Sequence, residues 1–436
     1  MLTHEDEKYR QLLIIGNGFD LQCKLKSSYT EFLKKRREEG GNIDINGAKA
    51  CNNLWDCIFY YYQELKNPMV DWQDIETVIK DFVTNKQSKI TNLVYVLLYK
   101  KYFEGQVKLE QSSSVDGMKW HELGILISDF LIDKYSTKIT QILNTNNKKH
   151  LSSDLQQLHK NISITYDSLD NKIKAVTSYE TGKEEIKYIE LDTDTFAELY
   201  FEELLNFEKD FAQYLIGEQE LNHVYEKNSE SLMINIIKDN MSGKSFKNSE
   251  LRKIECRVLS FNYTELPSSF ILVNSHMITA IKNVHGKLSD GNIIFGIDSA
   301  HIDNESNQHI IDYTKAFRTL TLTERIEMGS LLDGEVDVIK IYGHSLNEQD
   351  YSYFFSIFDK VNLYAGRTKL VVYYSVYDET TQSKESRKVS VALNKLLGHY
   401  GSTMDNSDHG KNLLHKIQLE NRLRISELNG VHKLKN

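Results

Sequence analysis

The sequence predicts an α/β fold in which a mostly parallel sheet receives a large helical insertion. Three observations support this prediction. An apolar run at residues 12–15 ends in a glycine turn and leads into helical periodicity over residues 19–35. Short apolar runs bounded by Gly, Asn or Asp return only after Arg252. Between these regions, residues 30 to 245 show mainly helical spacing and no convincing buried strand.

The first apolar run has the features of a nucleotide-binding strand. Gly16 and Gly18 follow it directly, and the backbone N–H groups of such a turn can approach a pyrophosphate closely. The standard dinucleotide fingerprint requires a third glycine where this chain has Leu21, so the pattern is incomplete. A tight strand-to-helix turn without a ligand is therefore the alternative interpretation of this stretch.

The composition is that of an ordinary globular chain. Of 436 residues, 40% are hydrophobic and 26% are charged, and the formal net charge is −9. A net acidic chain is not typical of dedicated nucleic-acid binders. The charged N-terminus lacks the apolar core of a signal peptide, and no apolar run reaches the roughly 18 residues that a membrane span needs. We therefore expect no membrane association.

The cysteines indicate neither a metal site nor a disulfide framework. None of them forms a C-x-x-C pair, so a zinc ribbon or a thioredoxin-like site is not predicted. Their scatter suits free thiols in a reducing compartment, and we expect a cytoplasmic protein without a bound metal. The four residues are Cys23, Cys51, Cys57 and Cys256.

The predicted organisation is discontinuous. Residues 1–35 and 250–400 together form a Rossmann-like nucleotide-binding domain, residues 36–249 a mostly helical insertion, and residues 401–436 a helical tail. The strands expected to join the first run are residues 256–262, 281–286, 292–297, 336–343 and 368–376. In the insertion the clearest helices are 48–65, 69–82 and 196–215, and residues 164–169 and 186–191 are candidate short strands. Residues 411–425 of the tail predict a surface or oligomerisation helix.

Polar residues follow the predicted strands where each strand ends. Because the carboxyl ends of parallel strands share one edge of a sheet, and ligands bind at that edge, we expect these residues to meet there. Singly, an Asn after a strand is more often a turn residue, and a His before Gly is more often structural. The candidate residues are Gly16, Asn17, Gly18, Phe19, Asp20, Asn262, Tyr263, His285, Gly296, Asp298, Gly343, His344 and Ser345.

These motifs resemble a known family. The segments LLIIGNGFDL, SSYTEFL, WQDIE, SFNYTE, NVHG, IIFGID and IYGHSLNEQDYSYF are similar to those of the bacterial AbiH family of phage abortive-infection proteins. The resemblance covers most of the chain sparsely, and its first and last motifs are the most specific. One departure is Lys26, where the family often has proline. The resemblance implies a role in antiviral defence.

At a greater distance the order of motifs resembles sirtuin-like NAD-binding domains, especially the defence-associated ones that hydrolyse NAD. That resemblance carries the catalytic asparagine onto Asn262 and the catalytic histidine onto His285. The zinc-ribbon cysteines of sirtuin deacylases are missing, and a helical insertion replaces their compact small domain. Both departures weaken a deacylase interpretation more than an NAD-hydrolase interpretation.

The resemblance implies hydrolysis of NAD⁺, as substrate and with no further cofactor, to nicotinamide and ADP-ribose. Asn262 is expected to position the ribose or the attacking water, and His285 to act as a base. The turn at residues 16–18 would hold phosphate, while Asp20 and Asp298 would orient the ribose or the His ring. The remaining binding residues would line the ribose and adenine sides.

Two other classes of function stay open. A non-catalytic sensor would bind NAD or an ADP-ribose-type nucleotide with the same fold, and a solvent-blocked His285 beside a retained glycine turn would favour it. A nuclease toxin would need clustered carboxylates or a basic groove, and neither is visible. Family analogy adds two expected partners, a phage-derived trigger protein and further copies of the same chain in a homo-oligomer.

Overall fold

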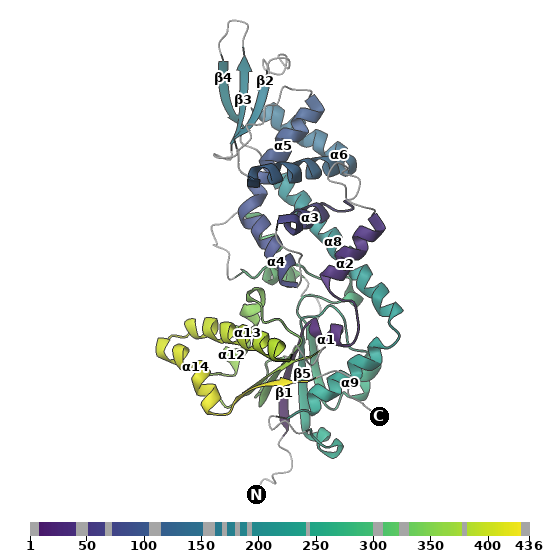
Figure 1. Cartoon of the computed structure of the whole chain (residues 1–436), viewed down its shortest axis with the longest axis vertical. Helices are drawn as coiled ribbons and strands as arrows, with labels where there is room; N and C mark the ends of the chain where they lie inside the picture. The colour runs from purple at the N-terminus through teal and green to yellow at the C-terminus, as the bar shows by residue number, and fades with distance from the viewer. Residues whose placement is uncertain are drawn as a thin grey trace. The chain divides into compact units, whose positions relative to one another are not determined.

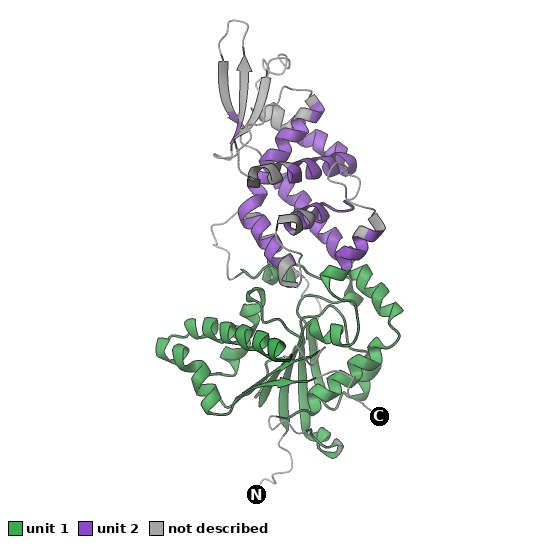
Figure 2. Ribbon diagram, in the orientation of Figure 1, with its two compact units in different colours: residues 1–31, 209–304, 314–436 green, residues 32–208, 305–313 purple. Residues whose placement is uncertain are grey.

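The computed structural model describes the chain as two compact units. The described residues are 8–40, 51–65, 72–103, 115–150, 162–167, 172–178, 184–189, 194–240, 245–299, 308–321, 331–376 and 382–428. Unit 1 comprises residues 1–31, 209–304 and 314–436, and unit 2 comprises residues 32–208 and 305–313 (Figure 2). The divisions at 31/32 and 208/209 fall inside two helices, α2 (Tyr29–Gly40) and α8 (Asp194–Leu221).

Unit 1 is built on a six-stranded sheet in which every pairing is parallel. The strand order is β6-β5-β1-β7-β8-β9. Numbered along the chain, this is the order 3-2-1-4-5-6 of a doubly wound nucleotide-binding sheet, which reverses direction between β1 and β7. The strands are β1 (Tyr9–Ile15), β5 (Ile254–Ser260), β6 (Ile278–Asn283), β7 (Val338–Tyr342), β8 (Lys369–Tyr374) and β9 (Leu423–Glu427).

Helices cover both faces of this sheet because its strands are apolar on both sides. In β1, Leu12 and Ile14 pack into one core, whereas Leu13 and Ile15 pack into the other. The first core is closed by α12 (Tyr351–Lys360), α13 (Gln382–Ser402) and α14 (Ser407–Leu419). The second is closed by α1 (Gly18–Gln22), α9 (Tyr225–Lys238) and α10 (Ser268–Val273). Figure 1 shows α12–α14 and α9 on opposite sides of the sheet.

Lys340 is one of the ionisable side chains buried inside the sheet, and burial lowers its pKa to about 7. Lys340 of β7 is 1% exposed, and its Nζ donates to Gln11 Oε1 at 2.8 Å. The same ammonium donates to the carbonyl oxygens of Ile236, Ile237 and Asp239, at 2.7, 3.1 and 2.6 Å. These carbonyls belong to the end of α9, where a helix has acceptors without intrahelical partners. Lys340 therefore fastens the C-terminus of α9 to the centre of the sheet.

Unit 2 is mainly helical. Its further helices are α3 (Leu54–Leu65), α4 (Trp72–Asp81), a π-helical turn (Phe82–Lys86), α5 (Gln87–Phe103) and α6 (Val115–His150). A small antiparallel sheet has the order β2 (Ile162–Asp167), β3 (Lys172–Ser178) and β4 (Glu184–Ile189). The buried Glu203 of α8 accepts hydrogen bonds from Lys134 at 2.8 Å and from Tyr135 at 2.5 Å. Tyr135 has non-helical backbone angles, so this carboxylate binds α6 at its kink.

The predicted α/β class, with its parallel sheet and helical insertion, is confirmed. The candidate strands at 164–169 and 186–191 correspond to β2 and β4, whereas β3 was not predicted. Parts of two predicted helices, residues 48–50 and 69–71, lie outside the described residues. Among the described residues, no helix has both the length and the apolar composition needed to span a bilayer.

Two element predictions were wrong. Residues 292–297 are buried but do not form a strand, because their backbone pairs with His285 O and, at one bridge, with Thr314. Apolar character there reports burial rather than membership of the sheet. The predicted helix at 411–425 ends at Leu419, and the chain then enters β9, which pairs with β8.

Candidate functional site

The candidate residues lie at the carboxyl edge of the sheet of unit 1, on both sides of the point where the strand order reverses. Gly16 follows β1 and Gly343 follows β7, the two strands that flank this point. The structure separates the candidates into an accessible rim and a buried layer. The rim holds Asn17, Gly18, Gly343 and Ser345, and the buried layer holds Phe19, Asp20, Asn262, Tyr263, His285, Gly296 and Asp298, with the His344 side chain only 4% exposed.

The rim is formed by two interlocked glycine turns. A Cβ on Gly18 would lie 2.7 Å from Gly343 Cα, and a Cβ on Gly343 would lie 2.4 Å from Phe19 N. Gly343 also has a φ of +69°, which disfavours any other residue. These glycines therefore allow the backbones that leave β1 and β7 to pack directly against each other.

The amides of the first turn already have partners within the chain. Gly16 N donates to Tyr342 O at 3.0 Å, and Gly18 N donates to Gly343 O at 2.8 Å. Phe19 N donates to Gly16 O at 2.8 Å. A phosphate at this turn would have to replace these carbonyl acceptors, so the turn as described is closed rather than preformed for an anion.

Beneath the rim lies the Asp20 cluster, which consists of Asp20, Tyr225, Thr264 and Asn262. Asp20 is 2% exposed, and its two oxygens accept hydrogen bonds from Tyr225 OH and Thr264 Oγ1, each at 2.7 Å. Burial raises the pKa of Asp20 to about 6, against the opposing effect of Thr264, Tyr225 and Asn262. This carboxyl group therefore titrates close to physiological pH.

Asn262 is the least satisfied polar side chain at this edge. It is 2% exposed, and although it lies close enough to Asp20 to lower the pKa of that carboxyl group, neither its Oδ1 nor its Nδ2 makes a hydrogen bond of good geometry. Its backbone is held, because Asn283 Nδ2 donates to Asn262 O at 2.7 Å and Asn262 N donates to Ser260 Oγ at 3.2 Å. A cavity of about 10 Å³, the size of one water, is lined by Asn262 and Thr264 among others. A rigid backbone thus presents an amide with unmet hydrogen-bonding capacity.

A second buried group is the His285 cluster, which consists of His285, His344, Lys315 and Asp350. Lys315 Nζ donates to Asp350 Oδ1 at 2.8 Å. His285 Nε2 lies 3.5 Å from Asp350 Oδ1, and His344 Nε2 lies 3.4 Å from Asp350 Oδ2. The ring of Phe261 packs edge-on against both imidazoles, with centroids 5.4 and 4.3 Å away.

The His285 cluster has a neutral imidazole beside a charged pair. Burial, followed by the nearby Lys315 ammonium, lowers the pKa of His285 to about 3. Burial alone would raise the pKa of Asp350, but Lys315 and the hydrogen bond from His344 hold that pKa well below its usual range. At neutral pH, His285 is therefore uncharged and can accept a hydrogen bond or a proton.

Two of the predicted binding residues have structural tasks. Asp298 accepts hydrogen bonds from Ser352 Oγ at 2.7 and 2.6 Å and from Ser352 N at 3.3 Å, which anchors the first turn of α12. Tyr263 OH donates to Ile294 O at 2.9 Å and holds the buried segment 292–297. Neither side chain points to an open site in the described chain.

The structure brings the predicted residues to one edge of the sheet, but it does not join the predicted catalytic residues by hydrogen bonds. The Asn262 side chain makes no hydrogen bond, and so none joins it to His285. Sequence reasoning missed Lys315 and Tyr225, which come from helices rather than strand ends. Asp350 and Thr264 were present in the recognised motifs. Their charged or hydroxyl side chains, close after the ends of strands, could have identified them as members of the site.

The described residues offer no obvious metal centre. Within them, no group of three or more His, Cys, Asp and Glu side chains could hold a metal ion. The imidazoles and carboxylate of the His285 cluster are of ligand type, but the Lys315 ammonium already pairs with the carboxylate. The nuclease hypothesis gains no support from this part of the chain.

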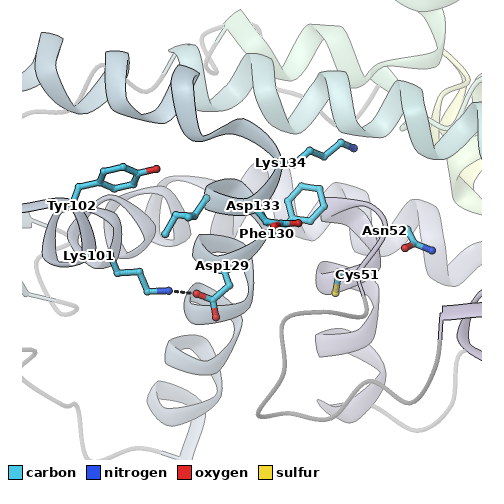
Figure 3. A pocket seen from close by; sticks show the side chains of 9 residues that line it. Cys51, Asn52, Lys101, Tyr102, Asp129, Phe130, Asp133 and Lys134 are labelled. Carbon is cyan, nitrogen blue, oxygen red and sulfur yellow. Dashed lines mark hydrogen bonds and ion pairs between the residues drawn. The ribbon is translucent and has the colours of Figure 1, made fainter.

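Unit 2 has a groove of its own. Its volume is about 1010 Å³, and it lies beside α5 and α6 (Figure 3). Lys101 points to Asp129 and forms an ion pair with it, while Lys134 pairs with Glu203. The lining residues are Cys51, Asn52, Lys101, Tyr102, Asp129, Phe130, Ile132, Asp133 and Lys134. Its two lysines and two aspartates give the groove no single sign of charge.

Comparison with known proteins gives one match. The sequence model of the family described as "Bacteriophage abortive infection AbiH" matches residues 12–374, which span both glycine turns, the Asp20 cluster and the His285 cluster. No curated protein sequence matches the chain.

Proposed function

The chain belongs to the AbiH family of bacteriophage abortive-infection proteins, and from that premise we propose that it is an effector that hydrolyses NAD⁺ to nicotinamide and ADP-ribose when triggered. NAD⁺ depletion would arrest the infected cell before phage replication is complete. The motif order that resembles sirtuin-like NAD hydrolases motivates the choice of substrate. The trigger protein and assembly into a homo-oligomer are expectations from family analogy.

One observation carries the proposal. At the carboxyl edge of a sheet with the order 3-2-1-4-5-6, Asn262 and His285 are buried, and their polar side-chain atoms Oδ1, Nδ2 and Nε2 lack hydrogen-bond partners. Leaving such atoms unpaired costs about 1–3 kcal/mol each. Unmet capacity at the ligand-binding edge is accounted for if a substrate or water completes these bonds.

The proposed chemistry suits these groups. The bond between ribose C1′ and nicotinamide N1 breaks, the electron pair leaves with the ring, and the ring becomes neutral without a general acid. Water adds to C1′ and loses one proton. Asn262 would orient the ribose hydroxyls or this water. His285 would accept the proton in an opened form, because burial lowers its pKa to about 3 in the described form and makes the ring a weak base there. An ionised Asp20 would stabilise the developing positive charge at the sugar.

We further propose that the described form is a resting form. The His285 side chain is 4% exposed, and the turn amides donate to Tyr342 O and Gly343 O. Separation of the two glycine turns would free these amides for the pyrophosphate and give water access to the buried layer. This opening is the step that a trigger would favour.

The test is nicotinamide release from NAD⁺ by the full chain in extracts of phage-infected cells, which supply the trigger. We expect His285→Ala and Asn262→Ala each to lower the rate by at least about 100-fold, the usual range for a lost acid–base or positioning group. The matched controls are His276→Ala and Asn412→Ala, at exposed positions, which should keep the rate. Circular dichroism and thermal melts must show that all four variants fold. Undiminished release by folded His285→Ala and Asn262→Ala would exclude this mechanism.

A nucleotide sensor is the second candidate, and the same burial of His285 favours it. In that case the fold would bind NAD⁺ or ADP-ribose and change its conformation without breaking a bond. Calorimetry with NAD⁺ separates the candidates. Binding with no nicotinamide release, in cells as well as with purified protein, would support the sensor and exclude the hydrolase.

A further inference from the structure

We infer that Lys315 and Asp350 are positioning residues that set the charge of His285 and, through Asp350, hold the Nε2 side of His344. The contacts among these residues are observed in the structure. Only their role in catalysis rests on the proposed function. Neither residue follows a strand of the sheet, and Lys315 belongs to no recognised motif. Neither touches the reacting atoms in the proposed chemistry.

The ion pair is built into the fold rather than lying on its surface. The Lys315 side chain is 3% exposed and that of Asp350 is 10% exposed. Lys315 begins α11 (Lys315–Thr321), and its backbone N donates to Ile297 O at 3.0 Å. Asp350 ends a 3-10 turn (Glu348–Asp350) just before α12. Both groups are therefore placed by backbone as well as by each other.

Asp350 faces both imidazoles. His344 Nδ1 accepts a hydrogen bond from Leu346 N at 2.9 Å, so the proton of neutral His344 must be on Nε2. That Nε2 lies 3.4 Å from Asp350 Oδ2, which receives the N–H. The other oxygen, Oδ1, binds Lys315 and lies 3.5 Å from His285 Nε2. One carboxylate thus lies 3.4 and 3.5 Å from the Nε2 atoms of both rings, although His285 Nε2 makes no hydrogen bond to it.

Lys315 determines what this carboxylate does to His285. The charged or titratable groups that face His285 are Lys315, Asp350, His344 and Tyr353. With Lys315 present, its ammonium offsets the carboxylate, and His285 stays neutral. Without Lys315, an uncompensated Asp350 carboxylate would attract a proton to the imidazole. The pair therefore helps to keep the His285 ring neutral and, because its pKa is lowered, a weak proton acceptor in the described form.

The experiment is ¹⁵N–¹H NMR of the histidine rings in the full chain between pH 5 and 8, with His285→Gln and His344→Gln to assign signals. In the wild type we expect His285 to stay neutral throughout and His344 to carry its proton on Nε2. Titration of His285 in this range, or an Nδ1–H tautomer of His344, would overturn the inference. This arm needs no variant of the pair.

The variants test which residue is responsible. Lys315→Met should raise the protonation midpoint of His285, followed down to the lowest pH at which the chain stays folded, whereas Lys315→Arg, which retains the charge, should leave that midpoint unchanged. Asp350→Asn should leave His285 neutral and weaken the Nε2–H hydrogen bond of His344. An unchanged His285 in folded Lys315→Met would contradict the inference, because a merely structural lysine would not move that midpoint.

The two proposals fail separately. If NAD⁺ is not cleaved but the ring signals behave as expected, the proposed function fails and the positioning pair stands. If NAD⁺ is cleaved, Lys315→Met should lower kcat below its new midpoint with little change in KM. A kcat profile that is identical to that of the wild type would overturn the positioning role and leave the hydrolase intact.

Discussion

Lys340 and Asn262 are both buried polar side chains of unit 1, but they differ in how many hydrogen bonds they make. Lys340 is 1% exposed and donates to four acceptors, three of them carbonyls at the end of α9. Asn262 is 2% exposed, and its amide has no partner. Because a buried polar group is costly unless it is hydrogen-bonded, the first site is complete and the second is incomplete. A ligand that supplies the missing hydrogen bonds would therefore stabilise the second site more than the first.

The largest effect is expected where the network is complete. Lys340→Met would leave Gln11 and the carbonyls of the α9 C-terminus without their buried donor. We expect the free energy of unfolding to fall by about 4 kcal/mol, in the range for breaking a buried charged network. Urea unfolding at pH 7 measures it. A loss below about 1 kcal/mol would mean that water replaces the lysine as donor, and that Lys340 is not more important for stability than Asn262.

An intermediate effect on the free energy of unfolding is expected at Asp20. Its carboxylate accepts two hydrogen bonds, but burial still disfavours the ionised form. Its pKa is raised from 3.8 to about 6, so the folded chain holds a proton that the unfolded chain has lost. The contribution of Asp20 to stability is therefore full below pH 3.8 and lost as the pH rises through 6. The difference in unfolding free energy between wild type and Asp20→Asn should fall by about 2 kcal/mol from pH 4 to pH 7. A difference that does not change with pH would place the titration elsewhere.

The smallest effect on stability is expected at Asn262. Asn262→Leu removes two buried polar atoms that make no hydrogen bond of good geometry, so we expect a change within about 1 kcal/mol of zero, or a gain. The same substitution should abolish nicotinamide release. Unfolding in urea and the release assay are measured on one preparation. A large loss of stability would show that the Asn262 amide is already satisfied, and the contrast with Lys340 would disappear.

The class of fold and the meeting of the candidate residues at one edge of the sheet could be predicted because both depend on local signals. The run at residues 12–15 and those at 256–262 and 336–343 are apolar on both faces, as parallel strands must be, and each ends in a polar motif. That places their carboxyl ends at one edge. The reversal between β1 and β7 depends on strand order, which pairwise tertiary packing decides and no single run contains.

The misses also have physical causes. Residues 292–297 are as apolar as a strand because they are buried, but burial does not require a neighbouring strand. β9 follows a helix after only three residues, and its mixed polarity does not mark it as a strand. Lys315 joins the site through α11, at a separation of 35 residues from Asp350, and nothing local marks a lysine that will become buried. The engaged amides of Gly16 and Gly18 likewise depend on a partner turn more than 300 residues away.

Total NAD⁺ in phage-infected cells tests most directly our proposal that this chain protects by removing NAD⁺. Cells that carry the wild type should lose NAD⁺ after infection and be protected. Cells that carry His285→Ala at equal expression should keep both NAD⁺ and susceptibility, and the exposed control His276→Ala should behave as wild type. Protection by the wild type with an unchanged NAD⁺ level would contradict the account and leave nucleotide sensing as the better explanation.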